Sequence, residues 1–296
     1  MVEVRTGVAE EDIRRDAKHA LFVEGKDKNA IDPTVLRSLL PSSVRILALG
    51  PSFYVRSVAE ALYRHHPFYY FLIDRDHYDD SFVEECWRTF PNPNTANLLV
   101  WHRRELENYF LVPEYLSKSE YLAPSVGELR KCILDCSRKR VYLDAANQVI
   151  VSIREEMKRS DIPLFPSIHG FASAKEAFER LKNLPQWRQR DKAIGNLLGK
   201  REIKKRFSEV LFRLTGDRMP IEFGFGRWLE LLKGKEILPT VINRCFSVRD
   251  QQGRALQGRD RLMEVIKDLL RKDIAEQPDD FKRLHDVISR RLEAAV

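Results

Sequence analysis

Short runs of apolar residues alternate with amphipathic stretches between residues 20 and 110. Four of the runs have the length and composition of buried strands: Ala20–Glu24, Val44–Leu49, Phe68–Asp74 and Asn97–Trp101. Between them, apolar residues recur at helical spacing in three stretches: Pro33–Leu40, Phe53–His65 and Ser81–Phe90. Strands that alternate with helices indicate βαβ crossovers, so the sequence predicts an α/β fold with a mostly parallel sheet flanked by helices.

The pattern changes after Val112-Pro113. Glycine becomes sparse, strand-like runs fade, and long amphipathic stretches follow. Helices are predicted at Leu143–Arg159, Ala172–Leu184, Asp191–Leu214, Arg259–Lys272 and Phe281–Ala295, and a polar helix over residues 1–19 leads into the first strand. We therefore expect an α/β domain at residues 1–112 and a mainly helical region at residues 113–296, packed on the first domain or completing it.

Acidic residues follow three of the strand-like runs. Glu24 closes the first run, Asp74 and Asp76 close the third, and Glu105 and Glu107 come shortly after the fourth. Ligands collect at the carboxyl ends of parallel strands, so acids carried there by separate strands converge on one point. Residues two apart in an extended segment share a face, so Asp74 and Asp76 are expected to face one cation together. Glu105 and Glu107 have the same option if their segment is extended.

A cluster of carboxylates requires cations, and ligand sets made only of oxygen atoms suit Mg²⁺ or Mn²⁺. Such ions stabilise the attacking and leaving oxygens in phosphodiester hydrolysis. Glu24 is the candidate general acid or base, provided that burial or the metal tunes its pKa. Each acid also has an ordinary explanation: an Asp after a strand often caps a helix, as Asp79 before Ser81 indicates, and Glu105 and Glu107 would suit a solvated helix start.

The same residues resemble a known family. The strings LFVEGKD at 21–27 and IDRD at 73–76 are similar to the TOPRIM fold of topoisomerases, primases and OLD-type nucleases. The string ELENY at 105–109 is closer to the OLD-like branch, which includes the short effector nucleases of the PARIS anti-phage defence system. The resemblance covers residues 19–112 well and is looser beyond them, and residues 113–232 contain no family motif.

The resemblance implies metal-dependent nucleic-acid chemistry, with Glu24 as acid or base and Asp74 and Asp76 as metal ligands. Glu105 and Glu107 match the additional acids of the branch. The family also carries a lysine late in the chain near the metals, and the best match here is the Lys-Gly-Lys stretch at 233–235, which ends in Lys235. The alternative explanation for that stretch is a solvated turn between two helices.

No ATP-binding loop is visible in the sequence. The GNLLGK stretch at 195–200 has one residue too few between its glycines, and Arg201 stands where Ser or Thr would hold Mg²⁺. OLD enzymes carry their own ATPase domain, so the resemblance implies a separate ATPase sensor protein that restrains the nuclease until infection is sensed. It also implies a homodimer as the active form and tRNA as the favoured substrate over DNA.

The chain is basic, with a net charge of +7 over 296 residues. Because the predicted site is acidic, the excess positive charge must lie elsewhere, mostly after residue 130, and a polyanion such as nucleic acid is a favoured partner. The candidate phosphate contacts are Arg138, Lys139, Arg140, Arg188, Lys204 and Lys205. The alternative is that these runs only keep helix faces solvated.

Other features bound the location of the protein. No apolar stretch approaches the roughly 18 residues of a membrane span, and the N-terminus lacks the apolar segment of a secretory signal, so a cytoplasmic protein is expected. Four cysteines in a chain of this length indicate reduced thiols. Cys132 and Cys136 stand one helical turn apart, which is not a zinc-site spacing, and are expected to be ordinary buried or surface residues.

Two other functions remain open at this stage. The first is a non-catalytic module that binds nucleic acid or assembles a complex and keeps the sheet without the chemistry. It predicts salt-sensitive binding that survives removal of the acids. The second is phosphoryl transfer on a small molecule, which would show turnover of a phosphomonoester without nucleic acid.

Overall fold

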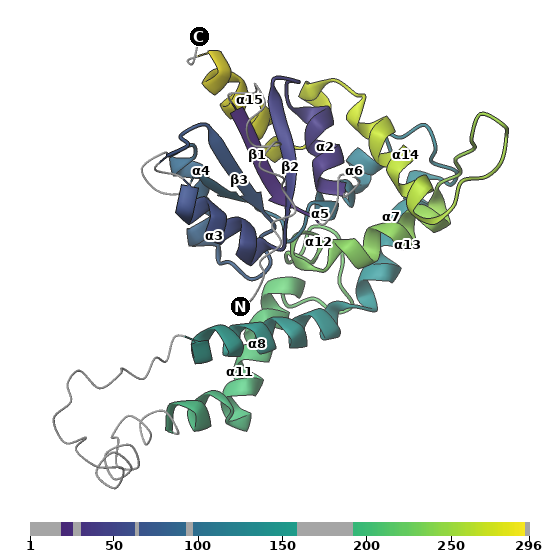
Figure 1. Cartoon of the computed structure of the whole chain (residues 1–296). Coiled ribbons are helices and arrows are strands. Elements are labelled where there is room, and N and C mark those ends of the chain that lie inside the picture. Colours follow the sequence, from purple (N-terminus) through teal and green to yellow (C-terminus); the bar gives the residue numbers. More distant parts are fainter. Residues whose placement is uncertain (1–18, 26–30, 63–64, 93–96, 159–191, 294–296) are drawn as a thin grey trace, which may run out of the picture. The chain divides into compact units, whose positions relative to one another are not determined.

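The computed structural model describes residues 19–25, 31–62, 65–92, 97–158 and 192–293. The chain divides into two compact units, whose elements are labelled in Figure 1. The first unit combines residues 1–140 with residues 228–296, and the second comprises residues 141–227. The first unit therefore contains residues from both sides of the predicted domain boundary at 112.

The first unit is built on a four-stranded sheet. Its strands are β1 (His19–Glu24), β2 (Val44–Gly50), β3 (Tyr69–Ile73) and β4 (Leu98–Val100). They lie in the order β2-β1-β3-β4, and every neighbouring pair is parallel. The central strands β1 and β3 are buried, in keeping with their continuous apolar runs. The predicted α/β class with a parallel sheet is confirmed.

One helix lies in each crossover between strands: α2 (Ile31–Leu39), α3 (Ser52–Leu62) and α4 (Asp80–Thr89). With this strand order, right-handed crossovers place α2 on one face of the sheet and α3 and α4 on the other, as Figure 1 shows. The Asp79 side chain accepts a hydrogen bond from Phe82 N at 2.8 Å, which confirms it as the cap of α4. Each predicted element of this region is confirmed, with ends that differ by three residues or fewer.

The other helices of the first unit come from two parts of the chain. The nearer part supplies α5 (Glu107–Phe110), α6 (Pro113–Leu116) and α7 (Val126–Arg138). The later part supplies α12 (Trp228–Leu231), α13 (Gly234–Cys245), α14 (Gly258–Leu270), the 3-10 helix η1 (Ile274–Glu276) and α15 (Asp279–Glu293). Helix α13 packs on α5 and α7, and α14 packs on α2. The predicted helical C-terminal region is therefore confirmed, and part of it packs around the sheet.

Phe281 of α15 fills an aromatic cluster beyond the end of β4. The centroid of its ring lies 5.6 Å from that of Trp101, 5.0 Å from that of Tyr109 and 5.9 Å from that of Phe110. All four side chains are almost completely buried. The cluster attaches the last helix of the chain to the segment that follows β4.

The second unit contains two long helices, α8 (Val141–Lys158) and α11 (Lys200–Thr215), which pack against each other. A helical stretch at 192–197 precedes α11, and Gly199 separates the two with extended backbone (φ −62°, ψ 136°). The prediction of one continuous helix over 191–214 is therefore wrong, because the chain leaves helical geometry at Gly199. The predicted helix at 172–184 lies outside the described residues, as does the predicted helix over 1–19 except for His19, which begins β1.

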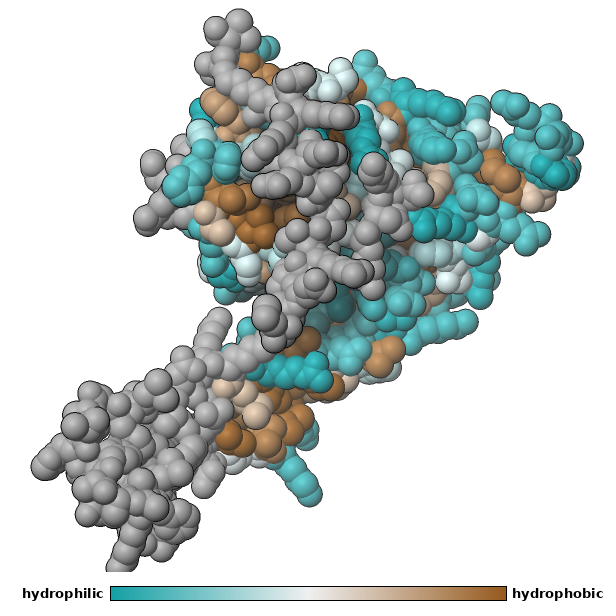
Figure 2. Space-filling view, viewed as in Figure 1, coloured by the Kyte–Doolittle hydropathy of each residue, from teal (hydrophilic) through white to brown (hydrophobic). Residues whose placement is uncertain are grey.

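Large apolar side chains are exposed on the second unit, where Figure 2 shows hydrophobic surface. The most exposed are Phe212 (62%), Tyr142 (56%), Leu143 (53%) and Leu198 (49%). Exposed apolar surface of this kind is typical of a protein interaction site. In the part of the chain that the structure describes, no helix combines the length and the apolar character needed to span a bilayer.

The aromatic cluster predicts a large difference between two Phe→Ala substitutions. Phe281→Ala leaves a cavity among packed rings and should lower the free energy of unfolding by about 3–5 kcal/mol. Phe53→Ala removes a side chain that is 72% exposed and should change it by less than about 0.5 kcal/mol. Urea unfolding followed by circular dichroism measures both. Equal stability of the two variants would contradict the assignment of Phe281 to the core.

Candidate functional site

Glu24 meets Asp74 at the carboxyl edge of the sheet. Glu24 is the last residue of β1, and Asp74 directly follows β3, the parallel neighbour of β1. The Glu24 Oε1 atom accepts a hydrogen bond from the Asp74 backbone N at 2.8 Å. The convergence expected from parallel strand ends is therefore present for these two acids.

The carboxylate of Asp74 joins two further segments of the chain. Asp74 is 2% exposed, and its Oδ1 accepts a hydrogen bond from Leu106 N at 3.2 Å. Its Oδ2 lies 2.5 Å from Lys235 Nζ, at the start of α13. Of the two lysines at 233–235, Lys235 thus reaches the acids, whereas Lys233 Nζ lies 3.5 Å from Glu236.

Glu105 and Glu107 are both buried beside this ion pair. Glu105 Oε2 accepts a hydrogen bond from Lys235 N at 2.7 Å, so it caps an amide that the first turn of α13 leaves without an internal partner. Glu107 begins α5 and is 2% exposed, and its Oε2 is buried with no hydrogen-bond partner among the described residues. A buried carboxylate oxygen without a donor is unfavourable, so this atom needs a proton or a cation.

Asp32 is an acid of this cluster that the sequence did not reveal. It lies in the first turn of α2, is 9% exposed, and interacts with the charges of Asp74, Glu107 and Lys235. The only signal was its place before Pro33 at a helix start, where an Asp ordinarily reads as a cap. Because α2 is an element of the crossover and not a strand end, only tertiary packing places Asp32 among the other acids.

Burial dominates the electrostatics of the cluster. Burial raises the pKa of Glu24 from 4.5 to about 8, and the negative charge of Asp74 adds to the effect. Burial also raises the pKa of Glu107 from 4.5 to about 8; Lys235 opposes this shift, and the charges of Asp74 and Glu105 reinforce it. In the absence of a further cation, both glutamates therefore favour the protonated form at neutral pH.

The pKa values of the other acids in the cluster are raised as well. Burial is the main cause that raises the pKa of Asp32, Asp74 and Glu105. Burial lowers the pKa of Lys235, but the carboxylates of Asp74, Glu107 and Asp32 more than offset this and hold it above its usual value. Lys235 is therefore charged, and the cluster contains more acid than one lysine can neutralise.

Asn108 connects the segment of Glu105 and Glu107 by hydrogen bonds to α12 and to the turn between α12 and α13. Its Oδ1 accepts a hydrogen bond from Glu105 N at 3.1 Å, and its Nδ2 donates to Leu229 O at 3.0 Å and to Leu232 O at 2.9 Å. Gly234 packs directly against it, because a Cβ at Gly234 would lie 2.5 Å from Asn108 Oδ1. Asn108 and Gly234 together therefore determine where the lysine at the start of α13 lies.

The extended geometry expected for Asp74 and Asp76 is wrong, and the segment of Glu105 and Glu107, for which it was only one option, is not extended. Strand β3 ends at Ile73, and Asp76 is exposed with a left-handed backbone (φ 46°), so Asp74 and Asp76 do not share one strand face. Between the two glutamates of ELENY, Leu106 has helical angles (φ −54°, ψ −37°). Turns, which apolar periodicity does not predict, bring these acids together. Asp76 still lies close enough for its charge to add to the burial that raises the pKa of Asp74.

The predicted phosphate contacts of the first unit lie at the end of α7. Arg138 and Lys139 are exposed, and Arg138 lies 3.6 Å from Asp135. Arg140 is less exposed and lies 3.9 Å from Glu236. The two arginines are therefore near acidic side chains, and Lys139 contributes exposed positive charge beside them.

The second unit carries the other predicted contacts. Lys204 and Lys205 are exposed on α11, and Lys205 lies 3.9 Å from Glu209. Exposed ion pairs of this length are weak, so these lysines keep most of their capacity to bind phosphate. Arg188 lies outside the described residues.

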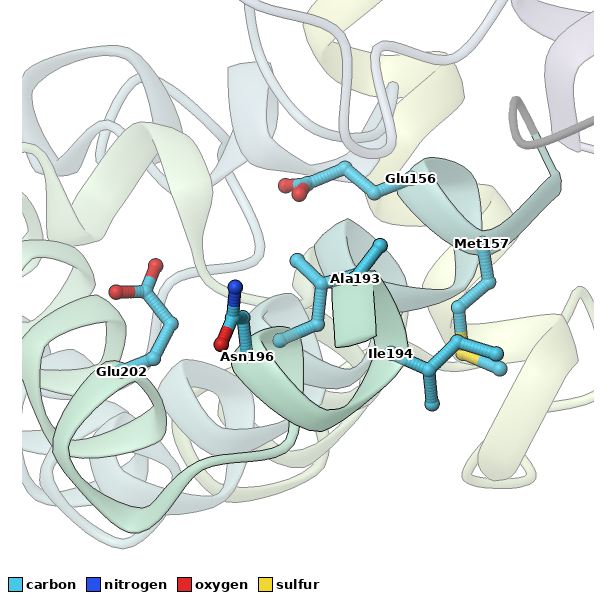
Figure 3. Close-up of a pocket in the computed structure, with 7 residues that line it drawn as sticks. Glu156, Met157, Ala193, Ile194, Asn196 and Glu202 are labelled. Carbon is cyan, nitrogen blue, oxygen red and sulfur yellow. The ribbon is translucent and has the colours of Figure 1, made fainter. Parts of the chain in front are cut away.

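A cavity of about 470 Å³ opens in the second unit, between α8 and the helical stretch that precedes α11 (Figure 3). Two carboxylates line it, those of Glu156 and Glu202. Both bind the guanidinium of Arg206, at 3.1 Å from Glu156 Oε2 and 2.7 Å from Glu202 Oε1. The charges of this cavity are therefore already paired, and none of the predicted site residues lines it.

The acidic cluster fits a hard divalent ion in its chemistry. Its donors are carboxylate oxygens, most of them buried, and Glu107 Oε2 lacks a partner within the described ranges. The positions of these side chains do not form a metal site as they stand. Among the described residues, no group of three His, Cys, Asp or Glu side chains is placed to hold an ion, and the Lys235 ammonium contacts Asp74. No protein-family model, curated protein or solved structure matches this chain.

The raised pKa of Glu107 predicts how stability depends on pH in metal-free protein. Glu107 binds its proton more tightly in the folded state than in the unfolded state. The contribution of Glu107 to stability therefore falls as pH rises from about 4.5 to about 8 and then levels off. Glu107→Gln cannot ionise. It should flatten this slope and raise the free energy of unfolding at pH 8 by about 1–3 kcal/mol.

Urea unfolding with a chelator at pH 6, 7 and 8 measures this effect. Asp260→Asn, which changes an exposed acid of α14, is the matched control and should leave the slope unchanged. A Glu107→Gln variant with the same slope as the unsubstituted protein would contradict the buried, proton-binding state of Glu107.

The contacts of Asn108 predict that Asn108→Ala frees Lys235. The substitution leaves Glu105 N and the carbonyls of Leu229 and Leu232 without their partner, so stability should fall by about 1–3 kcal/mol. Limited acetylation followed by mass spectrometry should show that Lys235 reacts at least about fivefold faster, relative to Lys233 in the same chain. Asn243→Ala, at an exposed asparagine of α13, should change neither quantity. Unchanged acetylation of Lys235 would show that Asn108 does not hold it.

Proposed function

We propose that this chain is a Mg²⁺- or Mn²⁺-dependent nuclease that hydrolyses phosphodiester bonds in nucleic acid. The observation that carries the proposal is the meeting of Glu24, Asp74, Glu105 and Glu107 with Lys235 at the carboxyl edge of a parallel sheet. Four separate segments supply these side chains, and their charges are not balanced without a further cation. The resemblance to TOPRIM nucleases of the OLD-like branch supports the same chemistry.

The acids divide between two tasks in this proposal. Asp74, Asp76, Glu105 and Glu107 would hold the ion, which when bound would act as a Lewis acid toward a phosphodiester oxygen. Glu24 would exchange a proton with the attacking water or the leaving oxygen. Because its Oε1 is occupied by Asp74 N, the proton resides on Oε2.

Lys235 would stabilise charge in this proposal. Asp74 binds its ammonium at the start of α13. The surrounding carboxylates raise the pKa of Lys235 by more than burial lowers it. A permanent positive charge at this edge would stabilise negative charge that develops on a phosphate during hydrolysis.

RNA, and tRNA in particular, is the proposed substrate over DNA. The support is the resemblance to short defence nucleases, the net charge of +7, exposed Lys139 just after α7, and the exposed lysines of α11. Positive side chains away from an acidic centre bind the backbone of a polyanion while its scissile phosphate approaches the acids.

The proposed biological setting is a toxic effector of anti-phage defence in the cytoplasm, held inactive by a separate ATPase. A homodimer is the proposed active form. The exposed apolar side chains of α8 and α11 support a protein partner of some kind, because such surface is typical of interaction sites.

The test is incubation of the purified protein with total RNA and with plasmid DNA, in Mg²⁺, Mn²⁺ or chelator, followed by mapping of the ends. Cleavage should require the divalent ion, and Glu24→Gln and Asp74→Asn should each lower its rate by at least about 100-fold. Asp260→Asn should cleave normally. Full activity in either site variant would refute the assignment.

The second candidate function is a non-catalytic module that binds nucleic acid or assembles a complex. The contact between the Lys235 ammonium and Asp74 favours it, because an internal cation already stands against the central acid. This alternative expects salt-sensitive RNA binding that is unchanged in Asp74→Asn, with no cleavage in any divalent ion.

A further inference from the structure

Three of the four cysteines lie together in the first unit, apart from the acidic cluster. Cys132 and Cys136 are one turn apart on α7, and Cys245 is the last residue of α13. The Cys132 side chain lies close to the side chains of both Cys136 and Cys245, since α13 packs against α7. The fourth cysteine, Cys86, belongs to α4.

Backbone contacts hold the end of α13 against the segment that leads into α7. Ala123 N donates to Cys245 O at 2.9 Å, and Ser247 N donates to Tyr121 O at 3.0 Å. An isolated antiparallel bridge between Leu122 and Phe246 lies between these two contacts. The position of Cys245 beside α7 is therefore set by the main chain and not only by side-chain packing.

The three thiols differ in access. Cys136 and Cys245 are 7% and 4% exposed, whereas Cys132 is partly exposed. Burial raises the pKa of Cys132 to about 11, and the nearby charge of Arg244 opposes the shift. Because the thiolate is the nucleophile that attacks peroxide, the more accessible Cys132 reacts first but slowly at neutral pH.

We propose that peroxide converts Cys132 and Cys245 into a disulfide that joins α7 to α13. The Cys132 thiolate attacks the O–O bond, which leaves a sulfenic acid on Cys132 and releases hydroxide. The Cys245 sulfur then attacks the Cys132 sulfur, so the S–S bond forms as the S–O bond breaks and water leaves. Two thiols and one hydrogen peroxide thus give one disulfide and two waters, and the two electrons lost by sulfur reduce the peroxide.

Cys245 is the partner because it approaches from another helix. Cys136 shares α7 with Cys132, and the Cα–Cβ bonds of two residues one turn apart point in the same direction, which disfavours a bond between them. The disulfide would close at the end of α13 opposite to Lys235, so oxidation acts on the helix that also carries the lysine of the acidic cluster. This site does not depend on the proposed nuclease activity.

The test treats the reduced full-length protein with hydrogen peroxide at pH 8, blocks the remaining thiols, and maps the peptides without reduction. The thiol count should fall from four to two, a Cys132–Cys245 linked peptide should appear, and dithiothreitol should reverse both changes. Cys86→Ser is the matched control and should still give the linked peptide. Cys132→Ser and Cys245→Ser should each abolish it.

The unsubstituted protein alone decides the question, so a variant that folds poorly does not obscure it. Thiols that stay reduced, a Cys132–Cys136 link, or a disulfide between two chains would each overturn the proposal. A Cys136–Cys245 link would do the same.

Discussion

One lysine stands against a group of buried carboxylates, and the arrangement of the first unit depends on that contact. The Lys235 ammonium binds Asp74, and the backbone N–H of the same residue donates to the Glu105 carboxylate. An ion pair that includes a buried carboxylate is favourable only when its geometry is closely held, since Asp74 has left water while the Lys235 side chain stays 38% exposed. The close packing of Gly234 on Asn108 and the hydrogen bonds of Asn108 supply that constraint.

The contact between Lys235 and the acids depends on the path of the chain. Lys235 reaches the acids only because the chain leaves the first unit after residue 140 and returns at residue 228. The returning helices pack on the sheet and on the segment after β4, where Phe281 completes an aromatic cluster. Helices far along the sequence are therefore structural parts of the site, in addition to any separate task of the second unit.

The two candidate functions differ in how the unbalanced negative charge is neutralised. In a nuclease, a divalent ion would supply the missing positive charge beside Lys235, and Asp74, Asp76, Glu105 and Glu107 would hold it. In a binding module, protons and Lys235 are sufficient, as the raised pKa values of Glu24 and Glu107 allow. The partnerless Glu107 Oε2 is the atom at which these two states would differ most, because it is buried without a hydrogen-bond donor among the described residues.

The sequence by itself determined the α/β class, the strand and helix order of residues 19–101, and the acids at the strand ends, because periodicity and strand ends are local properties. It also pointed to Lys235 through a resemblance, with no basis for choosing it over Lys233. Only the tertiary structure decided that choice, added Asp32, and replaced the extended acidic pairs by turns at Asp76 and Leu106. These features depend on packing between distant segments, such as those of Asp74 and Lys235, which are 161 residues apart, and no local pattern encodes such packing.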